Sequence, residues 1–198
     1  AILSATGVRP VGFNAPGMRA TPDTFGILQD LGFLYHTDDL SRDEPFVIAV
    51  RRKPFVVVPY TFQLNDLQNY ENRWHTCDEF ASELKREFDA LYIESESKRR
   101  MMSVSAHDRV AGHASRTRVL EEFITYAERH PGVVFLRKDE IARFALSSPL
   151  TVREGDADIS TPEGSTQLQK GQMANVRGTG NAVRYQIVAA TGYDDFDR

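Results

Sequence analysis

Residues 103–116, with the sequence SVSAHDRVAGHASR, hold the side chains best suited to acid–base chemistry. An apolar run at residues 101–106 ends at His107, a glycine then interrupts the chain, and Ser115 can cap the helix that follows. A histidine at a strand end can reach into a cleft, and imidazole ordinarily titrates near neutral pH. His107 is therefore a candidate general acid or base. The same pattern is also typical of a loop histidine without a chemical role, and we interpret His113 in that way.

Two polar residues follow a second apolar run, residues 55–60. Asn65 and Asp66 lie beyond the carboxyl end of this predicted strand, and that end is the catalytic edge of a parallel barrel. Asp66 can bind polar groups of a substrate or orient His107, and a carboxylate that only caps a loop is an open alternative. We predict that Asn65 and Asp66 both bind substrate.

Aromatic residues near the same run are further candidates. Tyr60 can hydrogen-bond a substrate amide, although a tyrosine that ends a strand often only packs. Trp74 lies in the long connection at residues 65–77, where it can form a wall of a substrate pocket or simply pack. The acidic pairs at residues 38–39 and 194–195 are interpreted as solvated charge in polar loops.

The composition limits the class of protein. Of 198 residues, 41% are hydrophobic and 26% are charged, so the chain can bury the core of one domain. A net charge of −4 without a basic block argues against nucleic acid or a membrane surface as a partner. Cys77 is the only cysteine, which excludes an internal disulfide and a cysteine-cluster metal site. No apolar stretch approaches the roughly 18 residues that span a bilayer, and we expect a cytoplasmic protein.

Hydrophobic periodicity predicts alternating strands and helices. Thr21 and Pro22 mark the start of a first helix that ends at Gly32. The other predicted elements are strands at residues 46–50, 55–60, 101–106 and 133–136 and helices at residues 78–92, 115–130 and 139–144. In the helix at residues 115–130, the side chains predicted to face inward are Leu120, Phe123, Ile124 and Ala127. This order predicts an α/β fold with a parallel sheet or a (β/α) barrel.

The last part of the chain differs in composition. Residues 147–198 contain several glycines and few large apolar side chains, and residues 185–190 are the single good strand candidate there. We therefore expect two parts, a folded portion at residues 1–146 and an extension or partly disordered tail at residues 147–198.

Taken in order, these segments resemble the polysaccharide deacetylase superfamily, in particular its allantoinase-like and imidase-like branch. Residues 12–17, GFNAPG, look like the third motif of that family, with Asn14 in the place of the usual arginine. Residues 54–61, followed by Asn65 and Asp66, look like the strand and loop of the fourth motif. Residues 103–116 look like the last motif, whose histidine acts as the general acid. Residues 133–145 match the closing strand and helix.

The resemblance covers about residues 7–146, and the first two motifs of the family, which hold its aspartates and two metal-binding histidines, have no counterpart here. It therefore implies the C-terminal part of a deacetylase-type (β/α) barrel, incomplete in this chain. It implies no metal bound by this chain alone and a divalent metal, with zinc favoured, if the missing motifs are supplied. An N-terminal segment or a second chain would complete the barrel, in a homo- or hetero-oligomer.

The activity implied by the resemblance is hydrolysis of a C–N amide bond in a cyclic amide, a ureide or an N-acetylated sugar. His107 would be the general acid, and Asn14 would join the residues that contact substrate. We do not expect the chain to be active alone. Two alternatives remain: a non-catalytic scaffold or binding subunit that retains the fold, and a polar-ligand binding domain whose motif match is accidental.

Overall fold

The computed structural model describes residues 1–155 and 186–191, and the chain folds as two compact units. Unit 1 is formed by residues 1–60 and the segment that begins at Lys138, and unit 2 by residues 61–137 together with the last strand. The predicted boundary between residues 146 and 147 stays a prediction, and most of the predicted tail lies outside the described residues. No helix among the described residues is long and apolar enough to cross a membrane.

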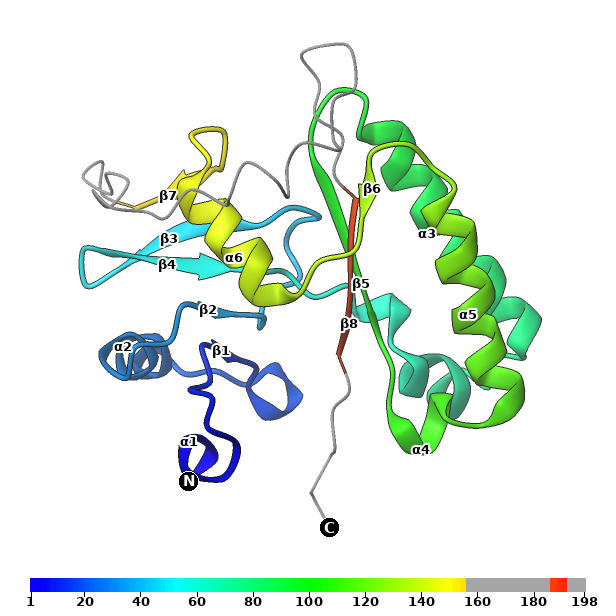
Figure 1. Cartoon of the computed structure of the whole chain (residues 1–198), viewed down its shortest axis with the longest axis horizontal. Coiled ribbons are helices and arrows are strands. Elements are labelled where there is room, and N and C mark those ends of the chain that lie inside the picture. Colours follow the sequence, from blue (N-terminus) through cyan, green and yellow to red (C-terminus); the bar gives the residue numbers. More distant parts are fainter. Residues whose placement is uncertain (156–185, 192–198) are drawn as a thin grey trace. The chain divides into compact units, whose positions relative to one another are not determined.

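Unit 1 is built on a five-stranded sheet (Figure 1). Its strands, in spatial order, are β1 (Gly12–Phe13), β2 (Tyr35–His36), β4 (Lys53–Val57), β3 (Phe46–Val50) and β7 (Arg153–Glu154). β1, β2 and β4 are parallel, whereas β3 runs antiparallel to β4. The helices of this unit are α1 (Ile2–Thr6), η1 (Pro16–Met18), α2 (Pro22–Asp30) and α6 (Lys138–Ser147).

The residues of β4 and α2 explain why these elements form. Phe55 and the three valines after it are almost completely buried, as expected for a strand that is covered on both faces. β4 begins two residues before the predicted strand because Arg51 and Arg52 both adopt positive φ angles, 49° and 65°, and close a tight hairpin with β3. At the start of α2, Thr21 and Thr24 form the predicted N-terminal cap through reciprocal hydrogen bonds.

Unit 2 has a parallel three-stranded sheet in the order β5 (Arg100–Ser105), β8 (Gln186–Thr191) and β6 (Val133–Val134). The predicted strand near the C-terminus is therefore present as β8, the middle strand of this sheet. The helical elements of the unit are η2 (Phe62–Leu64), η3 (Gln68–Asn72), α3 (Cys77–Glu94), α4 (Asp108–Ala111) and α5 (Ala114–Glu128). The predicted α/β class with parallel strands is confirmed.

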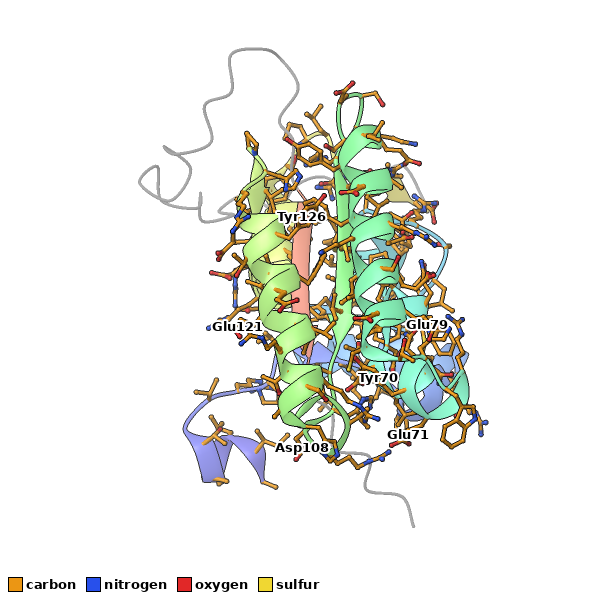
Figure 2. The ribbon with its side chains drawn as sticks, turned by 90° about the vertical axis from the view of Figure 1, so that its right-hand side faces the viewer. Tyr70, Glu71, Glu79, Asp108, Glu121 and Tyr126 are labelled. Carbon is orange, nitrogen blue, oxygen red and sulfur yellow. The ribbon has the colours of Figure 1, made fainter. Side chains whose placement is uncertain are left out.

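Helices α3 and α5 lie side by side in unit 2 and form its core with β5 (Figure 2). Phe88 of α3 packs edge-on against Phe123 of α5, with ring centroids 5.9 Å apart. A capping box starts α3, because the Glu79 carboxylate accepts the Thr76 backbone N–H while the Thr76 hydroxyl accepts the Glu79 N–H. The packing of these helices therefore holds β5 and the residues at its end, and the capping box fixes where α3 begins.

Three local predictions in unit 2 were wrong. α5 begins at Ala114 after His113, so Ser115 lies inside the helix and does not cap it. Ile124 is 40% exposed because Val119, rather than Ile124, completes the buried stripe with Phe123 and Ala127. The predicted buried strand at residues 133–136 shortens to two half-buried residues.

His36 is a buried titratable group within unit 1. Its ring lies between Phe25 and Phe55, with centroids 4.2 Å and 5.8 Å away, and its Nδ1 accepts the backbone N–H of Asp38 at 3.2 Å. Nε2 is buried without a hydrogen-bond partner among the described residues. Burial lowers the pKa of His36 from 6.5 to about 4, against a smaller opposite effect of Asp39.

Replacing His36 with Phe should therefore weaken the acid dependence of stability. The unfolded chain takes up a proton at His36 below about pH 6.5 while the folded chain does so only near pH 4, so the wild type loses roughly 3 kcal/mol between these values. Urea unfolding at a series of pH values, followed by circular dichroism, measures this loss, with His113→Gln as an exposed histidine control. An unchanged pH slope in the His36→Phe variant would contradict the assignment.

Candidate active site

A buried carboxylate and a histidine meet at the carboxyl end of β5 in unit 2. His107 Nδ1 and Asp66 Oδ1 are 2.6 Å apart, and the backbone N–H of His107 donates to the other carboxylate oxygen at 2.8 Å. Asp66 is completely buried and His107 is 6% exposed. The backbone N–H of Leu67 also donates to Asp66 Oδ1, at 2.7 Å. The carboxylate therefore holds both the ring and the backbone of His107.

This geometry selects one tautomer of His107. A carboxylate only accepts hydrogen bonds, so the Nδ1 that faces Asp66 carries a proton. Nε2 is then the ring nitrogen that can exchange a proton with a ligand. The arrangement is that of a histidine held by a carboxylate for general acid or base chemistry.

Two further sets of contacts fix the segment that carries Asp66 against β5. The backbone N–H of Thr61 donates to the Ser103 hydroxyl at 2.9 Å, and the N–H of Ser103 donates to the Thr61 hydroxyl at 3.0 Å. Asn65 forms a parallel bridge with Ser105, the last residue of β5. Because these contacts flank Asp66, its carboxylate has little freedom to leave His107.

The predicted substrate contacts of unit 2 have different surroundings. Asp66 has both oxygens occupied by protein donors, which favours the predicted role of orienting His107 over direct contact with a substrate. The side chain of Asn65 accepts the Gln68 N–H at 3.2 Å. Trp74 is 81% exposed, and its predicted contact with substrate stays a prediction. Its φ angle of 58° is uncommon for a bulky residue.

An ion pair and a stacked cation lie at the same end of unit 2. Arg109 pairs with Glu71 at 2.8 Å, and Arg116 lies over the ring of Tyr70, 4.2 Å from its centroid. Figure 2 shows Tyr70, Glu71 and Asp108 together at this end. Burial is the largest cause that raises the pKa of Tyr70, so its hydroxyl stays protonated at neutral pH.

Unit 1 contains its own polar cluster, at the carboxyl ends of β1 and β2. Asp38, which follows β2, accepts a hydrogen bond from the Asn14 side-chain amide, and its two oxygens lie 2.9 Å and 3.0 Å from the backbone N of Ala15. Burial raises the pKa of Asp38, against the lowering effects of the Ala15 N–H, the Asn14 amide and Lys138. The interpretation of the acidic pair at residues 38–39 as solvated charge was therefore wrong for Asp38.

Lys138 and Tyr60 complete this cluster. Lys138 is 9% exposed, and its Nζ lies 5.8 Å from the centroid of the Tyr60 ring. Burial lowers the pKa of Lys138 from 10.5 to about 8, while the Asp38 charge raises it. Sequence reasoning missed both Lys138 and Asp38. No strand was predicted before Asp38, so the sequence pattern gave no signal that this carboxylate lies at a strand end.

The motifs that hold the metal ligands of the family have no counterpart in this sequence. No three histidine, cysteine, aspartate or glutamate side chains in residues 1–155 and 186–191 are grouped so that they could hold a metal ion.

Replacing Asp66 with Asn should disturb both stability and the His107 tautomer. The new amide N–H₂ faces a backbone or ring N–H donor, so at least one buried hydrogen bond is lost, at a cost of about 1–3 kcal/mol. Urea unfolding measures this loss, and the ¹⁵N shifts of the His107 ring report the movement of the proton from Nδ1 to Nε2. Asp108→Asn, at an exposed position, is the matched control. Unaltered ring shifts would contradict the proposed orientation.

Known proteins with similar sequence or structure point to one superfamily. A probable polysaccharide deacetylase from Pseudomonas aeruginosa PAO1 is 34% identical, with a TM-score of 0.68 over 76% of this chain and 51% of that one. The PuuE allantoinase is 33% identical, with a TM-score of 0.67 and the same coverage. A putative polysaccharide deacetylase from Schizosaccharomyces pombe is 28% identical over 59% of this chain and 41% of its own length.

The fold alone is also similar to that of a putative polysaccharide deacetylase from Mycobacterium smegmatis, at 24% identity and a TM-score of 0.68. That match covers 78% of this chain and 56% of the other. No family model matches the chain. The chain thus spans about half the length of the relatives that it matches. Over that span, its resemblance to the polysaccharide deacetylases and to their allantoinase-like branch is confirmed by both sequence and fold.

Proposed function

We propose that this chain is part of a hydrolase of C–N amide bonds and that His107 is its general acid. The observation that carries the proposal is the buried pair in which Asp66 holds the Nδ1 side of His107. The names of the similar proteins support it, because deacetylation and the opening of allantoin both break a C–N bond.

In the proposed step, His107 acts on the leaving nitrogen. When water attacks the carbonyl carbon and the C–N bond breaks, the leaving nitrogen keeps the bonding electron pair and needs a proton. The protonated Nε2 of His107 donates that proton, and solvent later returns one to the ring. Asp66 does not react: it stabilises the ring while it carries a proton on both nitrogens and keeps Nε2 aimed in one direction.

Replacing His107 with Ala should lower kcat of the assembled enzyme by about 10²–10⁴-fold and change KM much less, because proton donation acts mainly in the transition state. Steady-state kinetics measure the split, and His113→Ala, at an exposed loop position, is the matched control. A kcat equal to that of the wild type would remove His107 from the mechanism.

We further propose that the substrate is a small cyclic amide or ureide rather than an N-acetylated sugar. The fourth-motif resemblance of residues 54–66 supports the cyclic class. Trp74 is 81% exposed, so it gives this choice of substrate no support from an enclosed pocket. The assembled protein should open the rings of allantoin, hydantoin or succinimide, monitored by the appearance of the carboxylate product. Release of acetate from chito-oligosaccharides, without ring opening, would reverse this assignment.

The second candidate is a non-catalytic scaffold or binding subunit that retains the fold without the metal motifs, which have no counterpart in this sequence. The two candidates differ in their dependence on His107, since a scaffold would fold and assemble equally well without its imidazole. Association with an N-terminal segment or a second chain stays a prediction. β1 lies at one edge of its sheet in the described part of the chain and offers a place for such a strand.

A further inference from the structure

The polar cluster of unit 1 lies where three parallel strands end. Asn14 directly follows β1, Asp38 comes two residues after β2, and Tyr60 comes three residues after β4. Because these strands are parallel and adjacent in the sheet, their carboxyl ends face the same way (Figure 1). Lys138, the first residue of α6, brings a cation to the same place.

Lys138 is the unusual member of the cluster. Its side chain is about nine-tenths buried. Within the described chain, the ammonium lies near the Tyr60 ring and feels the charge of Asp38 at longer range. No described residue forms a direct ion pair or accepts a hydrogen bond from it. A buried ammonium without an acceptor costs free energy, so a fold that keeps one has three donor hydrogens ready for a ligand.

Asp38 offers the complementary group. Its oxygens accept hydrogen bonds from Asn14 and Ala15, but a carboxylate has about four acceptor positions and these contacts leave capacity for another donor. Lys138 and Asp38 form no direct ion pair, so a donor at the start of α6 and an acceptor after β2 both stay available at this end of the sheet.

We propose that Lys138 and Asp38 bind a neutral ligand in which a carbonyl lies next to an N–H, as in an amide, imide or ureide. The ammonium donates to the carbonyl oxygen and the carboxylate accepts the N–H. An anion would pair with Lys138 but be repelled by Asp38. A cation would pair with Asp38 but be repelled by Lys138. The two opposite charges together therefore favour a neutral ligand. The choice of ligand class rests on the proposed function, whereas the site itself rests on unit 1 alone.

The protonation states agree with these roles. The pKa of Lys138, lowered to about 8, still leaves most of the ammonium charged at neutral pH, and that charge lowers the pKa of the partly buried Asp38 against the larger, raising effect of burial. Among the described residues, the titratable groups that act on the ammonium are Asp38, through its charge, and Tyr60, through its ring. Binding through Lys138 should accordingly weaken as the pH rises through about 8.

The test is calorimetric titration of the full chain with hydantoin at neutral pH, with succinate as an anionic comparison. The Lys138→Met and Asp38→Asn variants should each bind hydantoin about tenfold or more weakly, since each removes a hydrogen bond to a charged group. Lys98→Met, which removes an exposed lysine of unit 2, is the control and should bind as the wild type does. Succinate should bind more weakly than hydantoin.

Two outcomes would overturn the inference: hydantoin affinity that is the same in both cluster variants, or absence of hydantoin binding by the wild type at millimolar concentration. Tighter binding of succinate than of hydantoin would overturn the ligand class. If a cluster variant fails to fold, the wild type must still lose hydantoin affinity as the pH rises through about 8, and a flat profile would count against the site. A His107→Gln variant separates the two proposals, because it should lose turnover in the assembled enzyme while the chain still binds hydantoin.

Discussion

A single buried carboxylate, that of Asp66, organises the end of β5. An ionised carboxylate without solvent contact is costly unless it is fully hydrogen-bonded, and Asp66 receives two backbone N–H groups and the ring of His107. The reciprocal Thr61–Ser103 bonds and the Asn65–Ser105 bridge join the segment that carries Asp66 to β5. The cost of burying the charge is thus offset only in the conformation that also orients the imidazole. Local stability and acid–base geometry have the same cause.

Unit 1 deals with buried charge differently. His36 avoids the cost by remaining neutral, since its Nδ1 accepts an N–H and its ring packs between two phenylalanines. Lys138 has no such solution among the described residues, and desolvation lowers its pKa toward neutrality. The Asp66 carboxylate of unit 2 accepts hydrogen bonds from three protein donors, whereas the Lys138 ammonium has no acceptor among the described residues. Asp66 therefore acts as a positioning group for His107, and Lys138 keeps donor hydrogens that can bind a ligand.

The long periodic elements were predictable because each depends on its own side chains. α3 and α5 matched expectation within a few residues, and β3 matched it fully. The start of β4 was missed because tight-turn geometry at Arg51 and Arg52 moved the hairpin without any glycine signal. His107 and Asp66 were found because each follows an apolar run, although their contact spans 41 positions. Asp38 was missed because an acidic pair in a polar segment looks solvated until the sheet order brings Asn14 beside it.

The placement of these polar groups follows from how parallel strands are buried. Residues 55–57 of β4 and 101–105 of β5 are buried, so a charged side chain at these positions would be desolvated. Such a group is tolerated in the one or two residues after the strand, where backbone N–H groups supply partners. Asn14 and Asp38 occupy such positions in unit 1, and His107 occupies one in unit 2. A sequence with apolar strands of this kind can therefore carry its chemistry only at strand ends, whichever substrate the loops select.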